Sequence, residues 1–349
     1  FVSLVPTSWL VGGAGRPAGR AAVAPHRCPP VASELQVLLE RFMPTLPCID
    51  PATSAQRVAS VDGGALSSPV WLMPTLEEPE RGFVALADRG RQLRCDEAGA
   101  APEAMGLLSE CFSGTLNAPA FGAGAPGLDA VAAELGEPVR LVVSLGKNQM
   151  SDDEPQLLVA TEAGSVLWVG ERGKGDAGLG LGLDGERAKR RGRPVTTLLS
   201  GVGDVRGLCV SDGGMRARKL FLSLGDGTLQ VASLDLLDRG TASEPQQLGT
   251  VDGAAGPLAC DSVNNLYVCT SSGVQVYDDD GEPFLQVATP HPATGCCFGG
   301  PTMGSLFVTA GNTLWRLESN ARGVAPPTEA LLKQMEKLGG GDDFRHDGW

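Results

Sequence analysis

The chain has 349 residues, a formal net charge of −13 and only three histidines. This length can bury a full hydrophobic core, and the excess of acid excludes nucleic-acid binding as the main task, because phosphate contacts require a basic surface. The 48 glycines and 25 prolines, with few aromatic residues, favour many short strands joined by turns. Apolar runs all fall short of the roughly 20 residues that a membrane helix needs, so we expect no membrane span.

The N-terminal region has a composition of its own. Residues 1–32 are rich in Ala, Pro, Gly and Arg and contain no acid. Such a leader is typical of either an organellar targeting segment, for a plastid or a mitochondrion, or a segment that contacts a partner. The alternative is a plain disordered leader on a cytoplasmic protein. Residues 33–55 are predicted to form a helix and a linker, because "SELQVLLERF" (33–42) has a capping box and one apolar face.

From residue 56 the pattern changes to repeated β-hairpins. Each unit is an apolar strand, a turn with Gly or Asn, and a second apolar strand, as in "NLYVCTSSGVQVYDD" (265–279) and "SLFVTAGNTLWRLES" (305–319). The units recur at roughly 40–50 residues, which is typical of β-propeller blades. Five blades are legible, and "LNAPAFG" (116–122) with "RLVVSL" (140–145) could build a sixth. We therefore predict an all-β, six-bladed propeller over residues 56–323, flanked by N- and C-terminal helices and tails.

Two segments stand apart from the predicted blades. The insertion at 171–197 carries a basic run that could touch an acidic partner, although a solvated loop is the simpler interpretation. Its glycine pattern at 180–185 lacks the strand and helix that a dinucleotide site needs. Residues 324–349 are predicted to form a helix, over 328–338, and a tail. The candidate partner contacts in these two segments are Lys189, Arg190, Arg191, Arg193, Phe344 and Trp349.

The usual catalytic and metal-binding motifs are missing from the sequence. With three histidines, no C-x-x-C and no G-x-S-x-G, a catalytic triad or a zinc site in the blades is not expected. The run Asp278-Asp279-Asp280-Gly281 resembles the start of a calcium loop, but the later bidentate Glu is missing, so a turn is predicted. The nine cysteines are interpreted as buried free thiols, with a disulfide as the alternative.

The stretch 256–323 resembles the gluconolactonase/regucalcin (senescence marker protein) family through "NLYVCTSSGVQVYD", "CCFGG" and "LFVTAGNTLWRL". The resemblance is looser over 61–255. It implies a six-bladed propeller and a calcium- or zinc-dependent lactonase. The family's metal would lie in the central channel, held by a Glu, an Asn and an Asp from different blades.

This chain departs from the family at the positions that would hold the metal. The match places Ser67 where the family has Glu, Arg206 where it has Asn and Gly256 where it has Asp, and a further family Asn is Gly295. A dication requires oxygen ligands, and an arginine in the same channel repels it. We therefore expect no metal, no cofactor and no confidently assigned catalytic residue.

Two functions remain open from the sequence. The first is a non-catalytic binding or scaffold propeller, a pseudoenzyme, with an accessory role in an organellar complex, photosynthetic or respiratory. It would contact a protein partner through its tails or its insertion. The second is a metal-dependent or Arg-assisted lactone or ester hydrolase, in which Arg206 polarises a carbonyl and Asp62, Asp261 or Glu154 acts as base. A small anion bound at Arg206 is a further possibility.

Overall fold

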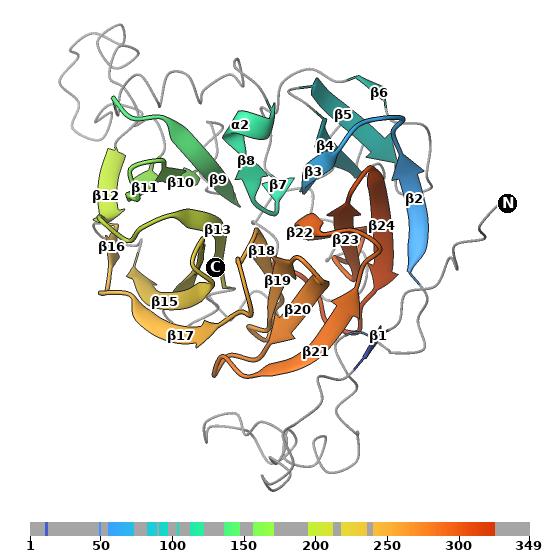
Figure 1. Cartoon of the computed structure of the whole chain (residues 1–349). Helices are drawn as coiled ribbons and strands as arrows, with labels where there is room; N and C mark the ends of the chain where they lie inside the picture. Colours follow the sequence, from blue (N-terminus) through green and yellow to red (C-terminus); the bar gives the residue numbers. More distant parts are fainter. Residues whose placement is uncertain are drawn as a thin grey trace, which may run out of the picture.

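The structure, a computed structural model, is described here for twelve segments of the chain. They are 11–12, 49, 55–72, 82–88, 91–96, 103–104, 112–121, 136–146, 156–170, 195–211, 218–235 and 240–324. Within these segments the strands form five antiparallel sheets arranged around a common centre (Figure 1). The prediction of an all-β propeller is therefore confirmed. The prediction of six blades is wrong for the described residues, which build five sheets.

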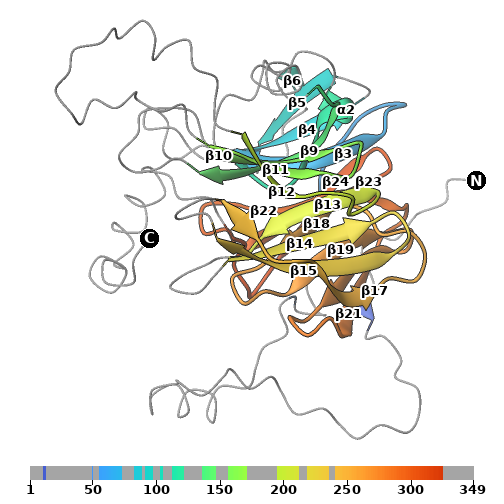
Figure 2. The same ribbon diagram turned by 90° about the vertical axis from the view of Figure 1, so that its left-hand side faces the viewer.

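Each sheet is built mainly from strands that follow one another in sequence. The first contains β3 (Leu66–Leu72), β4 (Phe83–Asp88), β5 (Arg91–Asp96), β6 (Glu103–Ala104) and β7 (Phe112–Ser113). The second contains β8 (Leu116–Asn117), β9 (Val139–Gly146), β10 (Gln156–Thr161), β11 (Val166–Val169) and β12 (Val195–Leu199). The third contains β13 (Val205–Val210), β14 (Arg218–Leu224), β15 (Thr228–Asp235), β16 (Thr241–Ala242) and β17 (Gln246–Thr250). Figure 2 views the ring from the side, with β5 and β6 at one end and β21 at the other.

The remaining two sheets use the part of the chain with the densest repeat. The fourth contains β18 (Leu258–Cys260), β19 (Leu266–Thr270), β20 (Gly273–Tyr277), β21 (Pro283–Ala288) and β1 (Val11–Gly12). The fifth contains β22 (Ala293–Gly299), β23 (Ser305–Ala310), β24 (Thr313–Glu318) and β2 (Gln56–Ser60). Because β2 precedes all the blades and pairs with the last hairpin, the two ends of the repeat close the ring.

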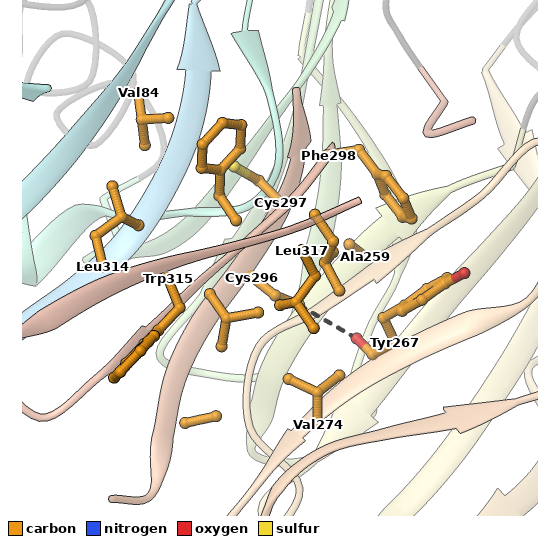
Figure 3. Packing of buried hydrophobic residues seen from close by; sticks show 14 of the residues in the cluster. Val84, Ala259, Tyr267, Val274, Cys296, Cys297, Phe298, Leu314, Trp315 and Leu317 are labelled. Carbon is orange, nitrogen blue, oxygen red and sulfur yellow. Dashed lines mark hydrogen bonds between the residues drawn. The ribbon is translucent and has the colours of Figure 1, made fainter. Parts of the chain in front are cut away.

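The core lies between neighbouring sheets. Every residue of β19 and β23 is buried, since both faces of these middle strands are covered by adjacent sheets. Figure 3 shows part of this packing, where the Tyr267 and Phe298 rings meet edge to face at 4.9 Å between centroids. In the same view the Cys296 thiol donates to the backbone oxygen of Tyr267 at 3.3 Å. Apolar side chains of consecutive sheets thus hold the ring together.

The two segments predicted to build a sixth blade, 116–122 and 140–145, belong to the second sheet instead. Strand β7 pairs with β3, strand β8 pairs with β9, and only the four-residue helix α2 (Ala118–Phe121) follows. "RLVVSL" lies in β9, which belongs to the sheet of β10 to β12. Gly114 has φ +110°, a value that favours glycine, and Pro119 cannot donate to a ladder. Strands β7 and β8, on either side of Gly114, are therefore only two residues long.

Several predicted features fall outside the described residues. They are the helices predicted at 33–42 and 328–338, the glycine pattern and the basic run of the insertion, and the chain ends at 1–10 and 325–349. Strand β1 lies in the expected leader and pairs antiparallel with β21, with Val11 opposite Val287. Among the described helices, none has the length and apolar character to cross a membrane. The described cysteines are buried and are not joined in disulfides, as predicted: Cys95, Cys209, Cys260, Cys269, Cys296 and Cys297.

Candidate functional site on the propeller axis

Two of the four sequence-predicted axis positions lie together at the seam between the first and fifth sheets. Ser67 is a partly buried residue on β3, opposite Ala87. Gly295 is on β22, and a Cβ there would lie 2.4 Å from Pro69 Cδ and 3.0 Å from the Ser68 nitrogen. The neighbouring Thr294 hydroxyl donates to Leu66 O at 2.6 Å, which ties the two strands together. Gly295 therefore occupies a place that has no room for a metal-binding side chain.

At the seam between the third and fourth sheets, Gly256 contacts Gly207, the residue after Arg206. Gly207, which follows Arg206 on β13, approaches Gly256 so closely that a Cβ on Gly207 would lie 2.9 Å from Gly256 O. The Ser223 hydroxyl donates to that same oxygen at 2.6 Å. A Cβ on Gly256 would lie 3.0 Å from Cys269 O, so an aspartate at 256 would require the backbone to shift.

A strand segment, residues 112–117, lies between these two pairs and fills the axis. A Cβ on Gly114 would lie 2.7 Å from Cys297 Cβ and 3.1 Å from Pro69 O, on the side of Ser67 and Gly295. Thr115 faces the opposite side, where its hydroxyl lies 2.5 Å from Leu208 O and 3.3 Å from Leu258 O. We call residues 112–117 the axial segment. Figure 1 places β7 and β8 among β3, β13, β18 and β22.

Further hydrogen bonds fix the axial segment at both ends. The Ser113 hydroxyl donates to Val324 O at 3.1 Å, and the Asn117 backbone N–H donates to Ser68 Oγ at 3.1 Å. Ser113 and Thr115 are both buried. Because β13 and β18 are edge strands of their sheets, the carbonyls that face the axis have no further strand to pair with, and Thr115 supplies the donor.

Arg206 is exposed and belongs to an ion-paired cluster with Asp204 and Arg140. Its Nε donates to Asp204 Oδ2 at 2.8 Å and its Nη2 lies 2.6 Å from the same oxygen, while Arg140 pairs with Asp204 Oδ1. Partial burial alone would raise the pKa of Asp204. The hydrogen bonds and charges of Arg206 and Arg140 outweigh it, so the net pKa of Asp204 is lowered. Arg206 thus stands at the rim, in the predicted strand but outside the metal position.

The residues present do not fit the dication that the family resemblance implies. In the described part of the chain, no group of three or more His, Cys, Asp or Glu side chains is placed to hold a metal ion. Of the four matched positions, Ser67 has a hydroxyl and Arg206 a guanidinium, and Gly256 and Gly295 have no side chain beyond a hydrogen atom. Calcium takes six to eight oxygen ligands, and zinc needs about four N, S or O ligands. No catalytic step through a metal is therefore derived for this chain.

The structure describes two of the three candidate bases, Asp62 and Asp261. Asp62 is exposed in a turn, and Glu154 lies outside the described residues. Asp261 is buried, and burial raises its pKa although four hydrogen bonds oppose the shift. The donors are the backbone N–H groups of Val263 and Asn265, the Asn265 amide and the Tyr267 hydroxyl. Asp261 therefore organises a turn and does not face the axis as an open base.

The run at 278–281 is a turn, as predicted. Asp278 Oδ1 accepts the backbone N–H groups of Asp280 at 3.0 Å and Glu282 at 2.9 Å, between β20 and β21. The candidate partner contacts lie outside the described residues and stay predictions: Lys189, Arg190, Arg191, Arg193, Phe344 and Trp349.

Sequence reasoning missed the residues that define this site. Asp204 and Arg140 are separated by 64 positions, and nothing local signals that they meet. Ser113 and Thr115 lie just before residues 116–122, the segment predicted to start a sixth blade, and no role was predicted for them. A short "SGT" between two apolar residues could have suggested a tight passage, but not its place on the axis.

Comparison with known proteins supports the family resemblance. Residues 212–312 match the sequence model of the SMP-30/Gluconolactonase/LRE-like region, which confirms the resemblance over that stretch. No curated protein sequence matches the chain. The fold that the sheets define is a β-propeller, and the resemblance is to the gluconolactonases and regucalcins.

Similar solved structures have low identity. One is a protein described as a gluconolactonase, with 19% identity, 80% of this chain and 98% of that chain covered, and a TM-score of 0.48. Another is a gluconolactonase from Xanthomonas campestris, with 16% identity, coverages of 87% and 99%, and a TM-score of 0.46. A third is regucalcin, a calcium-binding protein from Agrobacterium tumefaciens, with 14% identity, coverages of 74% and 77%, and a TM-score of 0.41.

Proposed function

We propose that this chain is a gluconolactonase-like β-propeller that acts by binding and does not hydrolyse lactones through a metal ion. The observation that carries the proposal is the axial segment. It occupies the centre of the ring, and Thr115 donates to one of two backbone oxygens that could otherwise face a ligand there. A substrate would have to displace this segment before it could reach the axis.

The chemistry of the surrounding positions supports the same conclusion. Ser67 brings no charge, and neither Gly256 nor Gly295 has a side chain that could coordinate an ion. Of the four positions Arg206 alone is charged, and its positive charge repels a cation. A lactonase of this family type would need the metal as Lewis acid and as activator of water. We therefore propose that the chain needs no metal cofactor.

The proposal extends to partners and location. A net charge of −13 disfavours nucleic acid, so the partner is proposed to be a protein. The basic run of the insertion, Lys189 to Arg193, and the tail residues Phe344 and Trp349 are its proposed contacts. The acid-free composition of residues 1–32 supports an organellar location, and an accessory subunit of a photosynthetic or respiratory complex is the proposed role.

Metal analysis combined with a lactone-hydrolysis assay tests this proposal. The purified chain is dialysed against Ca²⁺ or Zn²⁺, its bound metal is measured, and hydrolysis of glucono-δ-lactone is followed against the uncatalysed rate. We expect substoichiometric metal and no turnover above background. Stoichiometric metal with turnover would contradict the proposal. Metal-independent turnover that is lost in Arg206→Gln would instead favour the Arg-assisted hydrolase.

A further inference from the structure

The rim of the propeller carries two arginines that share one carboxylate. Arg140 is the second residue of β9 and Arg206 is the second residue of β13, so both lie at the start of neighbouring inner strands. Asp204 lies in the turn before β13 and accepts from Arg206 Nε, Arg206 Nη2 and Arg140. We call these three residues the rim cluster. Its net charge is +1 in a chain whose net charge is −13.

The backbone fixes the carboxylate at the centre of the rim cluster. Gly225 N–H donates to Asp204 O at 2.8 Å, and a Cβ on Gly225 would lie 2.3 Å from Asp204 Oδ2 and 3.3 Å from Arg206 Nε. Only a residue without a side chain leaves room for Asp204 in this position. The two guanidinium groups are therefore held in place before any ligand arrives, which lowers the entropic cost of binding.

Most of the donors in the rim cluster remain available. Each guanidinium has five N–H groups in a fixed plane, and Asp204 accepts from only three nitrogens of the pair. Within the described residues neither arginine has a second acidic partner. The Arg206 side chain is exposed, at 48%, and the Arg140 side chain is partly buried, with 21% exposed. Asp226, in the turn between β14 and β15, accepts from the Thr228 backbone N–H at 2.9 Å.

We infer that the rim cluster binds the carboxylate or phosphate group of a small anionic molecule. Two guanidinium groups with N–H donors that Asp204 does not use suit the oxygens of such an anion, and charge-assisted hydrogen bonds of this kind are about twice as strong as neutral ones. Asp204 neutralises one of the two positive charges and orients both side chains. This inference rests on the proposed binding function, because it names the ligand class that the propeller recognises.

The competing interpretation is that the three residues only bridge two sheets. Exposed ion pairs contribute about 0–1 kcal/mol to stability, and many contribute nothing measurable. A bridge of this kind would leave anion binding unchanged when one arginine is removed. The two interpretations therefore differ in a measurable quantity other than stability.

The test is an anion titration of the full-length chain without added metal. Inorganic phosphate and malonate serve as the phosphate and carboxylate probes, and binding is followed by isothermal titration calorimetry or NMR at low ionic strength. Arg206→Gln and Arg140→Gln are compared with Arg57→Gln, which removes the same charge from an exposed position on β2. Thermal unfolding of each variant is recorded in parallel.

We expect saturable binding of at least one probe, weakened about tenfold or more by Arg206→Gln or Arg140→Gln and little affected by Arg57→Gln. Stronger binding of malonate or of phosphate identifies which group the natural ligand carries. The inference is overturned if neither probe binds at millimolar concentration, or if all three variants weaken binding equally. A fall in melting temperature with unchanged anion affinity would also overturn it, in favour of a purely structural bridge. None of these outcomes depends on metal or lactone turnover, so they are separate from failure of the proposed function.

Discussion

Replacing Thr115 with valine tests whether the axial segment is held by its hydroxyl. The two side chains have nearly the same shape, so Thr115→Val removes the donor and leaves the packing almost unchanged. The buried carbonyl of Leu208, now 2.5 Å from the hydroxyl, would lose this donor. Leaving a buried acceptor unpaired costs about 1–3 kcal/mol. For a domain of this size each kcal/mol corresponds to a shift of about 2–4 °C in melting temperature.

Urea unfolding followed by tryptophan fluorescence would measure this loss. The control is Thr197→Val, which makes the same chemical change at an exposed position on β12 and is expected to alter stability by less than about 0.5 kcal/mol. Thr115→Val should unfold at clearly lower urea than both the parent chain and the control. Equal midpoints for the two variants would mean that Thr115 does not anchor the axial segment, and the proposed closure of the axis would lose its main support.

Three further substitutions test the packing and electrostatics around the axis. Gly114→Ala should destabilise the fold by several kcal/mol, because φ is +110° and Cys297 Cβ would lie 2.7 Å from the new Cβ. The control Gly136→Ala, at φ +66° with open space around it, should cost only about 1–2 kcal/mol. Similar losses for the two variants in urea unfolding would argue against a packed axis. Gly295→Asn should prevent soluble expression or lower the melting temperature strongly, since Pro69 Cδ would lie 2.4 Å from its Cβ, and a variant as stable as the parent would contradict this placement. Burial raises the pKa of Asp261 above its ordinary value of 3.8, so the native state binds more protons and the free energy of unfolding should fall as pH rises from about 4 through the native pKa. Asp261→Asn should flatten that dependence in unfolding curves between about pH 4 and 7, and an unchanged slope would refute the assignment.

The repeat pattern predicted most of the fold, because the signals are local. Alternating apolar residues and short polar turns place the hairpins of β19 with β20 and β23 with β24 within a residue or two of where they lie. The number of sheets could not be read in the same way. It depends on whether residues 112–121 pair with one another or with β3 and β9, and such long-range pairing leaves no mark in a short segment.

The candidate site was only partly predictable. The family match pointed to Ser67, Arg206, Gly256 and Gly295, and the structure places Gly295 against the β3 strand that carries Ser67, and Gly256 against Gly207, the neighbour of Arg206. The place of the axial segment and the ion pair between Asp204 and Arg140 depend on contacts between residues far apart in sequence. Asp204 sits two residues before Arg206, yet its second partner, Arg140, comes from a different sheet.

A crystal structure grown with calcium chloride would test the central claim most directly. The account predicts continuous protein density for the axial segment between Gly256 and Gly295, with the Thr115 hydroxyl against Leu208 O, and no ion bound by side chains there. Density for a calcium ion at the centre of the ring, ligated by oxygens of this chain and with the axial segment displaced, would contradict the account.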